Sequence, residues 1–140
     1  IGDELMMTGD CTGPISAEFV LKDPTVDFAV LECARGGLLR AGLGFHKCNT
    51  AVVTNVGGDH LGIGGIDTIE RLAHVKAVVT KVVLPGGYAV LNADDDLVYG
   101  MRKGTTGEVA LFSMNENSNR IKDHAKKDGL ACVYENGFVR

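Results

Sequence analysis

Short apolar runs alternate with helically spaced apolar residues along this chain of 140 residues. The runs are rich in β-branched and aromatic residues, which is typical of strands buried in a parallel sheet. Between them, apolar residues recur at steps of three and four, the spacing of an amphipathic helix. The predicted strands are residues 28–33, 51–56, 88–91, 109–112, 131–134 and 137–140. This alternation predicts an α/β fold, a mostly parallel sheet with right-handed crossovers and flanking helices.

Residues typical of helix ends support five predicted helices. Pro14 suits a first helical turn, and Thr68 suits an N-cap ahead of a long amphipathic segment. That segment should end at the Pro-Gly-Gly of residues 85–87. Carboxylates at residues 94–96 should open another helix, because they interact favourably with its dipole. The predicted helices begin at Pro14, cover 38–43, run from Ile69 to Val83, continue from 94–96 through Met101, and cover 118–127.

The length and charge of the chain limit its organisation and its partners. A chain of 140 residues is sufficient for one core, so we expect a single domain over residues 1–140. Its formal net charge of -4 lacks the basic excess typical of nucleic-acid binding. No apolar stretch approaches the roughly 20 residues needed to cross a bilayer, and the first residues do not resemble a signal peptide. We therefore expect a cytoplasmic protein that binds neither nucleic acid nor membrane.

The loop from Asn55 to Gly62 is the strongest candidate for chemistry. It includes the end of the apolar strand 51–56, which stops at two glycines, Gly57 and Gly58. It offers the amide of Asn55, the carboxylate of Asp59 and the imidazole of His60. Ligands of open α/β sheets collect at the carboxyl ends of the strands. Asn55 is therefore a candidate for cofactor binding and His60 for catalysis.

Two further side chains belong near this loop by topology. Glu32 lies at the end of the preceding predicted strand, and Lys76 lies on the apolar face of the following helix. Consecutive strands are usually adjacent, so Glu32 and His60 are candidate ligands of a divalent cation such as Mg²⁺. The alternatives are a loop salt bridge or cap for Glu32, a surface histidine at 60, and a snorkelling lysine at 76.

Common catalytic and nucleotide-binding patterns are missing from the sequence. Its glycine-rich loop matches neither G-x-x-x-x-G-K-[ST] nor G-x-G-x-x-G. It has no G-x-S-x-G and no H-E-x-x-H, so a serine hydrolase or a zincin is not supported. Its four cysteines include no C-x-x-C pair, so a zinc site is not indicated either.

Three segments in combination resemble the Mur ligase family: residues 30–45 (VLECARGGLLRAGLGF), 53–62 (VTNVGGDHLG) and 91–95 (LNADD). The similarity extends from Gly9 to about Ser113. It implies the later part of an ATP-binding central domain of the P-loop type. Cys11 stands where the family has the first threonine of its T-T-G-P loop, and Cys33 where threonine is commoner after the glutamate.

The resemblance implies a role for each candidate residue. Glu32 and His60 would help bind magnesium in the ATP site, and Lys76 would correspond to a lysine that several Mur ligases carbamylate. Asn92 and the Asp94-Asp95 pair would approach the adenine and ribose of ATP. Thr12 and Gly13 would face the acceptor substrate.

The implied activity is ATP-dependent amide-bond formation through an acyl phosphate. Within this family the chain resembles enzymes that add arginine to the β-carboxylates of a poly-aspartate backbone, so the expected partners are an amino acid, such an acceptor and the remaining domains of the parent enzyme. Homo-oligomerisation stays open. The family's G-T-N-G-K-T phosphate loop and C-terminal domain do not occur in this sequence, so we expect the isolated chain to be inactive. The alternative is a non-catalytic α/β scaffold or assembly module.

Overall fold

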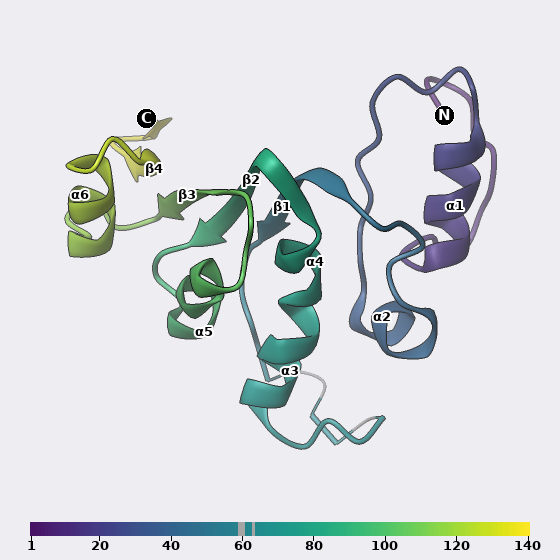
Figure 1. Cartoon of the computed structure of the whole chain (residues 1–140), viewed down its shortest axis with the longest axis horizontal. Helices are drawn as coiled ribbons and strands as arrows, with labels where there is room; N and C mark the ends of the chain where they lie inside the picture. The colour runs from purple at the N-terminus through teal and green to yellow at the C-terminus, as the bar shows by residue number, and fades with distance from the viewer. Residues whose placement is uncertain (59–60, 63) are drawn as a thin grey trace. The chain divides into compact units, whose positions relative to one another are not determined.

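The computed structural model describes residues 1–58, 61–62 and 64–140 (Figure 1). Its contacts divide the chain into two compact units, Ile1–His46 and Lys47–Arg140. Each unit is described by itself below. The expectation of a single domain stays a prediction, whereas the mixed α/β class with a mostly parallel sheet is confirmed.

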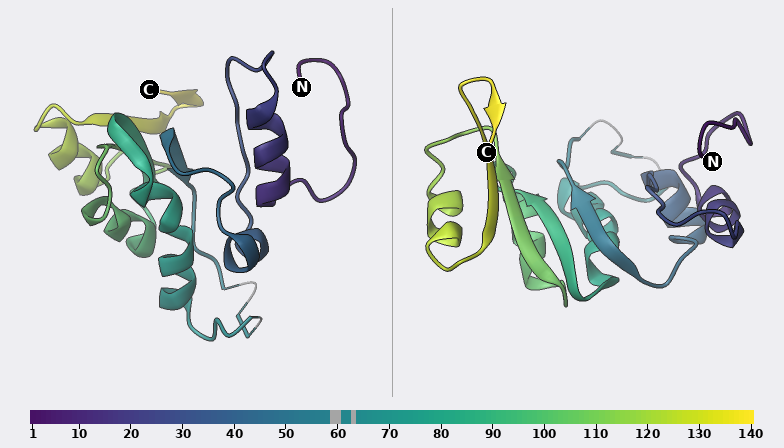
Figure 2. Two further views of the ribbon diagram at one scale, coloured as in Figure 1. Left: turned by 45° about the vertical axis from the view of Figure 1, so that its right-hand side comes forward. Right: turned by 90° about the horizontal axis from the view of Figure 1, so that it is seen from above.

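The second unit is built on a five-stranded sheet with the order β1-β2-β3-β4-β5 (Figures 1 and 2). The first four strands are parallel, and the last pairs antiparallel with β4. A turn at Asn136 and Gly137, both with positive φ, joins these last two strands, as is typical of a tight hairpin. The strands are β1 Cys48–Val53, β2 Val83–Asn92, β3 Glu108–Ser113, β4 Leu130–Glu135 and β5 Phe138–Val139.

Helices connect the parallel strands and cover the core. They are α3 Ile69–Lys76, α4 Val78–Lys81, α5 Asp96–Gly100 with the 3₁₀ turn η1 Met101–Lys103, and α6 Asn119–Ala125. The Thr68 hydroxyl caps α3 by accepting a hydrogen bond from the amide of Arg71 at 3.2 Å, as the sequence predicts.

The single long helix predicted from Ile69 to Val83 is wrong. The structure breaks it at Ala77 and ends its second part at Lys81. The Ala77 carbonyl accepts from both the amide and the hydroxyl of the buried Thr80, which replaces the regular helical pattern. Val83 then lies fully buried as the first residue of β2, where β-branched side chains are favoured.

The Pro-Gly-Gly segment also differs from its prediction, because it lies inside β2 and ends no helix. The register between β1 and β2 shifts between the Cys48–Val83 pair and the Thr50–Tyr88 pair. A Cβ atom at Gly87 would collide with the backbone carbonyl oxygen of Asn49. Glycine is therefore required where the irregular part of the strand approaches its neighbour.

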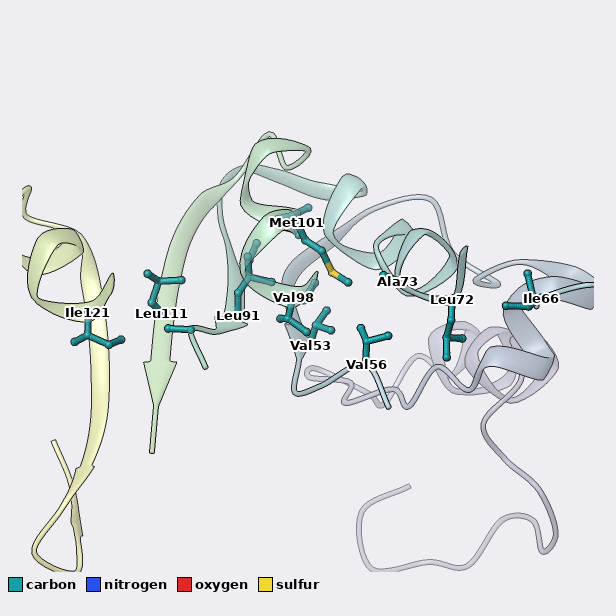
Figure 3. Packing of buried hydrophobic residues seen from close by; sticks show 14 residues of the cluster. Val53, Val56, Ile66, Leu72, Ala73, Leu91, Val98, Met101, Leu111 and Ile121 are labelled. Atoms are coloured by element: carbon teal, nitrogen blue, oxygen red, sulfur yellow. The ribbon is translucent and has the colours of Figure 1, made fainter. Parts of the chain in front are cut away.

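Alternate residues of the sheet form one buried cluster with the helices. Val53, Leu91 and Leu111 lie on neighbouring strands, and the last two are almost completely inaccessible to solvent. Val98 and Met101 pack against them from α5 and η1 (Figure 3). This cluster packs α5 and η1 against the sheet.

The first unit holds two short helices, α1 Pro14–Lys22 and α2 Arg35–Ala41. Pro14 occupies the first turn of α1, as predicted. The strand predicted at 28–33 is wrong, since these residues form no strand and the side chains of Phe28 and Val30 are 85% and 87% exposed. A strand needs at least one neighbouring strand to supply hydrogen bonds, and none of the described residues pairs with this segment.

Within the described residues, none of the helices has the length and apolar character needed to cross a bilayer.

The cysteine environments predict an order of alkylation. Cys11 is exposed, whereas burial raises the pKa of the Cys48 thiol. Because the thiolate is the reacting species, Cys48 should react slowest at neutral pH and accelerate only at alkaline pH, while Cys11 reacts first. Iodoacetamide labelling followed by peptide mass mapping measures both rates. Equal rates at the two sites would contradict the structure.

Candidate functional site at the carboxyl edge of the sheet

The carboxyl ends of β1, β2 and β3 place three polar segments side by side. Val53, Leu91 and Leu111 are in register, so Thr54, Asn92 and the Phe112–Ser113 end of β3 follow at the same edge. The sequence placed candidate chemistry at this edge because parallel strands share one direction. The structure brings together the predicted residues Asn55, Lys76, Asn92, Asp94 and Asp95 through the hydrogen bonds described next.

Asn92 and Asp94 link the ends of three strands. The Asn92 amide nitrogen donates to the Thr54 carbonyl at 2.8 Å, and its oxygen accepts from the Asp94 amide at 2.8 Å. The Asp94 carboxylate accepts from the hydroxyl of Ser113 and from the amide of Met114, at 2.5 and 2.7 Å. These bonds engage the side chains of two residues that the resemblance to the Mur ligases places near the nucleotide. Both side chains therefore brace the edge of the sheet.

Asp95 joins the start of α5 to the loop after β1. One carboxylate oxygen accepts from the amides of Leu97 and Val98, at 2.9 and 3.0 Å, which makes Asp95 the N-cap of the helix. The other oxygen accepts from the amide of Val56 at 2.8 Å. The Val56 side chain is buried in the core cluster, so this loop is held both by packing and by a charged acceptor.

Lys76 reaches the same loop from the last residue of α3. Its ammonium group donates to the Asn55 carbonyl at 2.9 Å. The side chain of Asn55 is exposed, and its amide nitrogen lies 3.4 Å from the Thr54 hydroxyl. Lys76 therefore reaches the carboxyl end of β1, as its position on the helix predicts.

Glu32, Thr12 and Gly13 belong to the first unit. Glu32 is exposed and lines a shallow depression together with Thr12 and Gly13. Hydrogen bonds from the side chain and backbone of Thr12 lower the pKa of the Asp10 carboxyl group, and Gly13 precedes α1 as its N-cap. The predicted metal residue and the predicted substrate loop are thus neighbours within this unit.

His60 lies outside the described residues, so its predicted pairing with Glu32 stays a prediction. In the described part of the chain, no three His, Cys, Asp or Glu side chains are grouped as a metal site requires. The donor chemistry still suits a hard cation, since Glu32 supplies an exposed carboxylate.

Sequence reasoning missed two parts of this edge. Ser113 is the first polar residue after the predicted strand 109–112, and the same strand-end rule that selected Asn55 would have found it. Arg120 donates to the Ala93 carbonyl at 2.8 Å and to the Asp96 carboxylate, and its guanidinium lies 4.3 Å from the centre of the Tyr99 ring. No local pattern indicated this contact, because Arg120 lies far along the chain on α6.

Known proteins match nearly the whole chain. Residues 8–137 match the Mur ligase middle domain. The chain belongs to the Mur ligase middle-domain family. Cyanophycin synthetase of Crocosphaera subtropica is 56% identical to it over 139 residues, and that of Geminocystis herdmanii is 55% identical over 139 residues. The cyanophycin synthetase of a Nostoc species is also 56% identical.

These alignments cover 99% of this chain but only 15–16% of each relative. The chain thus spans about a sixth of the length of these synthetases. Every candidate residue, from Thr12 to Asp95, falls within the part matched by the Mur ligase middle domain. The membership confirms the resemblance drawn from the motifs and agrees with the parallel sheet.

Proposed function

We propose that this chain is the later part of the ATP-binding domain of a cyanophycin synthetase. The full-length protein, meaning the product of the complete reading frame, would transfer the γ-phosphate of ATP to the β-carboxylate of a poly-aspartate acceptor. The amine of arginine would then attack the acyl phosphate, form the amide and release phosphate. The single observation that supports this most strongly is the 56% identity to cyanophycin synthetase across 139 residues.

The geometry of the carboxyl edge agrees with this reaction. Phosphoryl transfer mainly requires alignment and neutralisation of charge, which rigid and well-oriented groups supply. Lys76 contacts the loop after β1, and Asn92, Asp94 and Asp95 fasten the three strand ends to each other and to α5. The resulting edge is a rigid base on which ATP would bind. In this proposal Asn55, Asn92, Asp94 and Asp95 form or support the nucleotide site.

Glu32 and His60 would hold Mg²⁺, which neutralises the charge of the phosphates when it is bound. Lys76 and His60 would be the catalytic residues, with Lys76 carbamylated as in several Mur ligases. Thr12 and Gly13 would face the acceptor. The partners are then arginine, the poly-aspartate acceptor and the other domains of the full-length protein.

Coupled assays test this function directly. Full-length protein with ATP and Mg²⁺ should release ADP only when both arginine and poly-aspartate are present. Hydroxylamine should intercept the acyl phosphate as a hydroxamate. The isolated chain should not turn over ATP, with its His60→Ala variant as the control for contaminating ATPases. A full-length protein that releases no ADP under these conditions would instead favour the non-catalytic scaffold.

A further inference from the structure

The peptide group between Asn55 and Val56 is held at both ends by charged side chains. Its carbonyl oxygen accepts from the Lys76 ammonium at 2.9 Å, and its N–H donates to the Asp95 carboxylate at 2.8 Å. Lys76 ends α3, whereas Asp95 caps α5, so two helices meet at one peptide plane. Hydrogen bonds to charged groups are shorter and stronger than neutral ones, which restricts the rotation of this plane.

Three backbone amides already occupy three of the roughly four acceptor sites of the Asp95 carboxylate. One oxygen is shared by the amides of Leu97 and Val98, and the other faces Val56. The one remaining site is too few to accept from both hydroxyls of a ribose, although the resemblance to the Mur ligases implies that this segment approaches the adenine and ribose. The position of the Asp95 carboxylate instead controls the orientation of the carbonyl group that Lys76 contacts.

We infer that Asp95 is a positioning residue, which acts on Lys76 through the Asn55–Val56 peptide and does not bind the nucleotide. This inference rests on the proposed function, in which Lys76 is catalytic, and a carbamylated Lys76 would keep one N–H on Nζ to donate to the Asn55 carbonyl. Asp95 holds the peptide N–H, the peptide plane directs the Asn55 carbonyl, and the carbonyl fixes the side chain of Lys76. Arg120 on α6 holds the segment that leads to Asp95, because its guanidinium donates to the Ala93 carbonyl.

The variant Asp95→Asn separates the two roles of this carboxylate, the cap of α5 and the hydrogen bond to the Val56 amide. Asparagine is as good an N-cap as aspartate, so its oxygen should keep the two amides at the start of α5. Its NH₂ group then faces the N–H of Val56, and two donors meet without an acceptor. The cap of the helix is retained, and the hold on the peptide plane is lost.

Steady-state kinetics of full-length Asp95→Asn distinguish positioning from binding. We expect kcat to fall roughly 10- to 100-fold, the cost of a lost hydrogen bond to a charged group, while KM for ATP changes little. The matched control is Thr106→Val, which removes the 2.7 Å bond from the Thr106 hydroxyl to the Val83 carbonyl at the opposite edge of the sheet. A rise in KM for ATP with unchanged kcat, or an equal loss of kcat in the control, would overturn the inference.

Hydrogen exchange in the same full-length proteins provides a readout that is independent of activity. Asp95→Asn should speed exchange of the Val56 amide roughly 10-fold or more, while the amides of Leu97 and Val98 keep their protection. Lys76→Met should also speed exchange of the Val56 amide. In the double variant the exchange rate of this amide should be only slightly higher than in the faster single variant, because both side chains hold the same peptide. Additive effects would refute the coupling. Failure of the proposed function would appear separately, as wild-type protein without arginine-dependent ADP release.

Discussion

Full-length Lys76→Met should turn over ATP roughly a thousandfold or more slowly than the wild-type protein, since each 1.4 kcal/mol added to the barrier costs a factor of ten. Methionine keeps the length and apolar stem of the side chain but has neither the ammonium group nor the nitrogen that carries a carbamate. The 2.9 Å contact with the Asn55 carbonyl is therefore lost, and the carbamate proposed for this nitrogen cannot form. Arginine-dependent ADP release gives the rate.

Lys81→Met is the matched control for this substitution. Lys81 is exposed at the end of α4, and its replacement should leave turnover unchanged. Wild-type protein depleted of carbon dioxide should lose activity and regain it with bicarbonate, whereas Lys76→Met should not respond. If Lys76→Met retained nearly wild-type turnover, Lys76 would not be a catalytic residue, and its role would be that of a snorkelling lysine.

Gly87→Ala should lower the free energy of unfolding of the chain by about 3 kcal/mol, at the upper end of the usual cost of overpacking. The added methyl group would collide with the Asn49 carbonyl and approach the Leu84 carbonyl to 3.1 Å. Both obstacles are backbone atoms inside the β1–β2 pair, so neither can move as a flexible side chain would. Urea denaturation followed by circular dichroism measures the change.

Gly100→Ala provides the comparison at a glycine with open space. Gly100 ends α5, has φ of -61°, and has no atom within 4 Å of an added Cβ. Alanine there should stabilise the chain slightly, by roughly 0.5–1 kcal/mol, because it restricts the unfolded backbone. An unfolding midpoint for Gly87→Ala equal to that of wild type would show that the β1–β2 pair can adjust to a side chain.

The edge that holds the candidate site could be predicted from the apolar pattern. Four apolar runs alternate with helices, and this order favours parallel strands whose carboxyl ends share one edge. The order of the elements placed Asn55 at this edge, whereas Asn92, Asp94 and Asp95 were assigned to the nucleotide site through the resemblance to the Mur ligases. The spacing of Lys76 along its helix was also sufficient to predict that it reaches the same edge.

Local patterns were misleading where contacts distant in sequence decide the conformation. Val83 has helical spacing from Val79, yet it gains more by complete burial beside Cys48 in the sheet. Residues 28–33 have the composition of a buried strand, but a strand forms only where a neighbour supplies hydrogen bonds, and no described residue does so.

The alternation of elements, the parallel sheet and the edge at which polar residues gather depend on periodicity and order, so they can be predicted from the amino-acid sequence. Tertiary packing is needed to show which atoms of those residues are already engaged. Asp94 and Asp95 are adjacent in the sequence, yet one carboxylate holds Ser113 and the other holds Val56. A hydrogen bond requires its donor within about 3 Å and in line, and that geometry arises only when β1, β3 and α5 pack together.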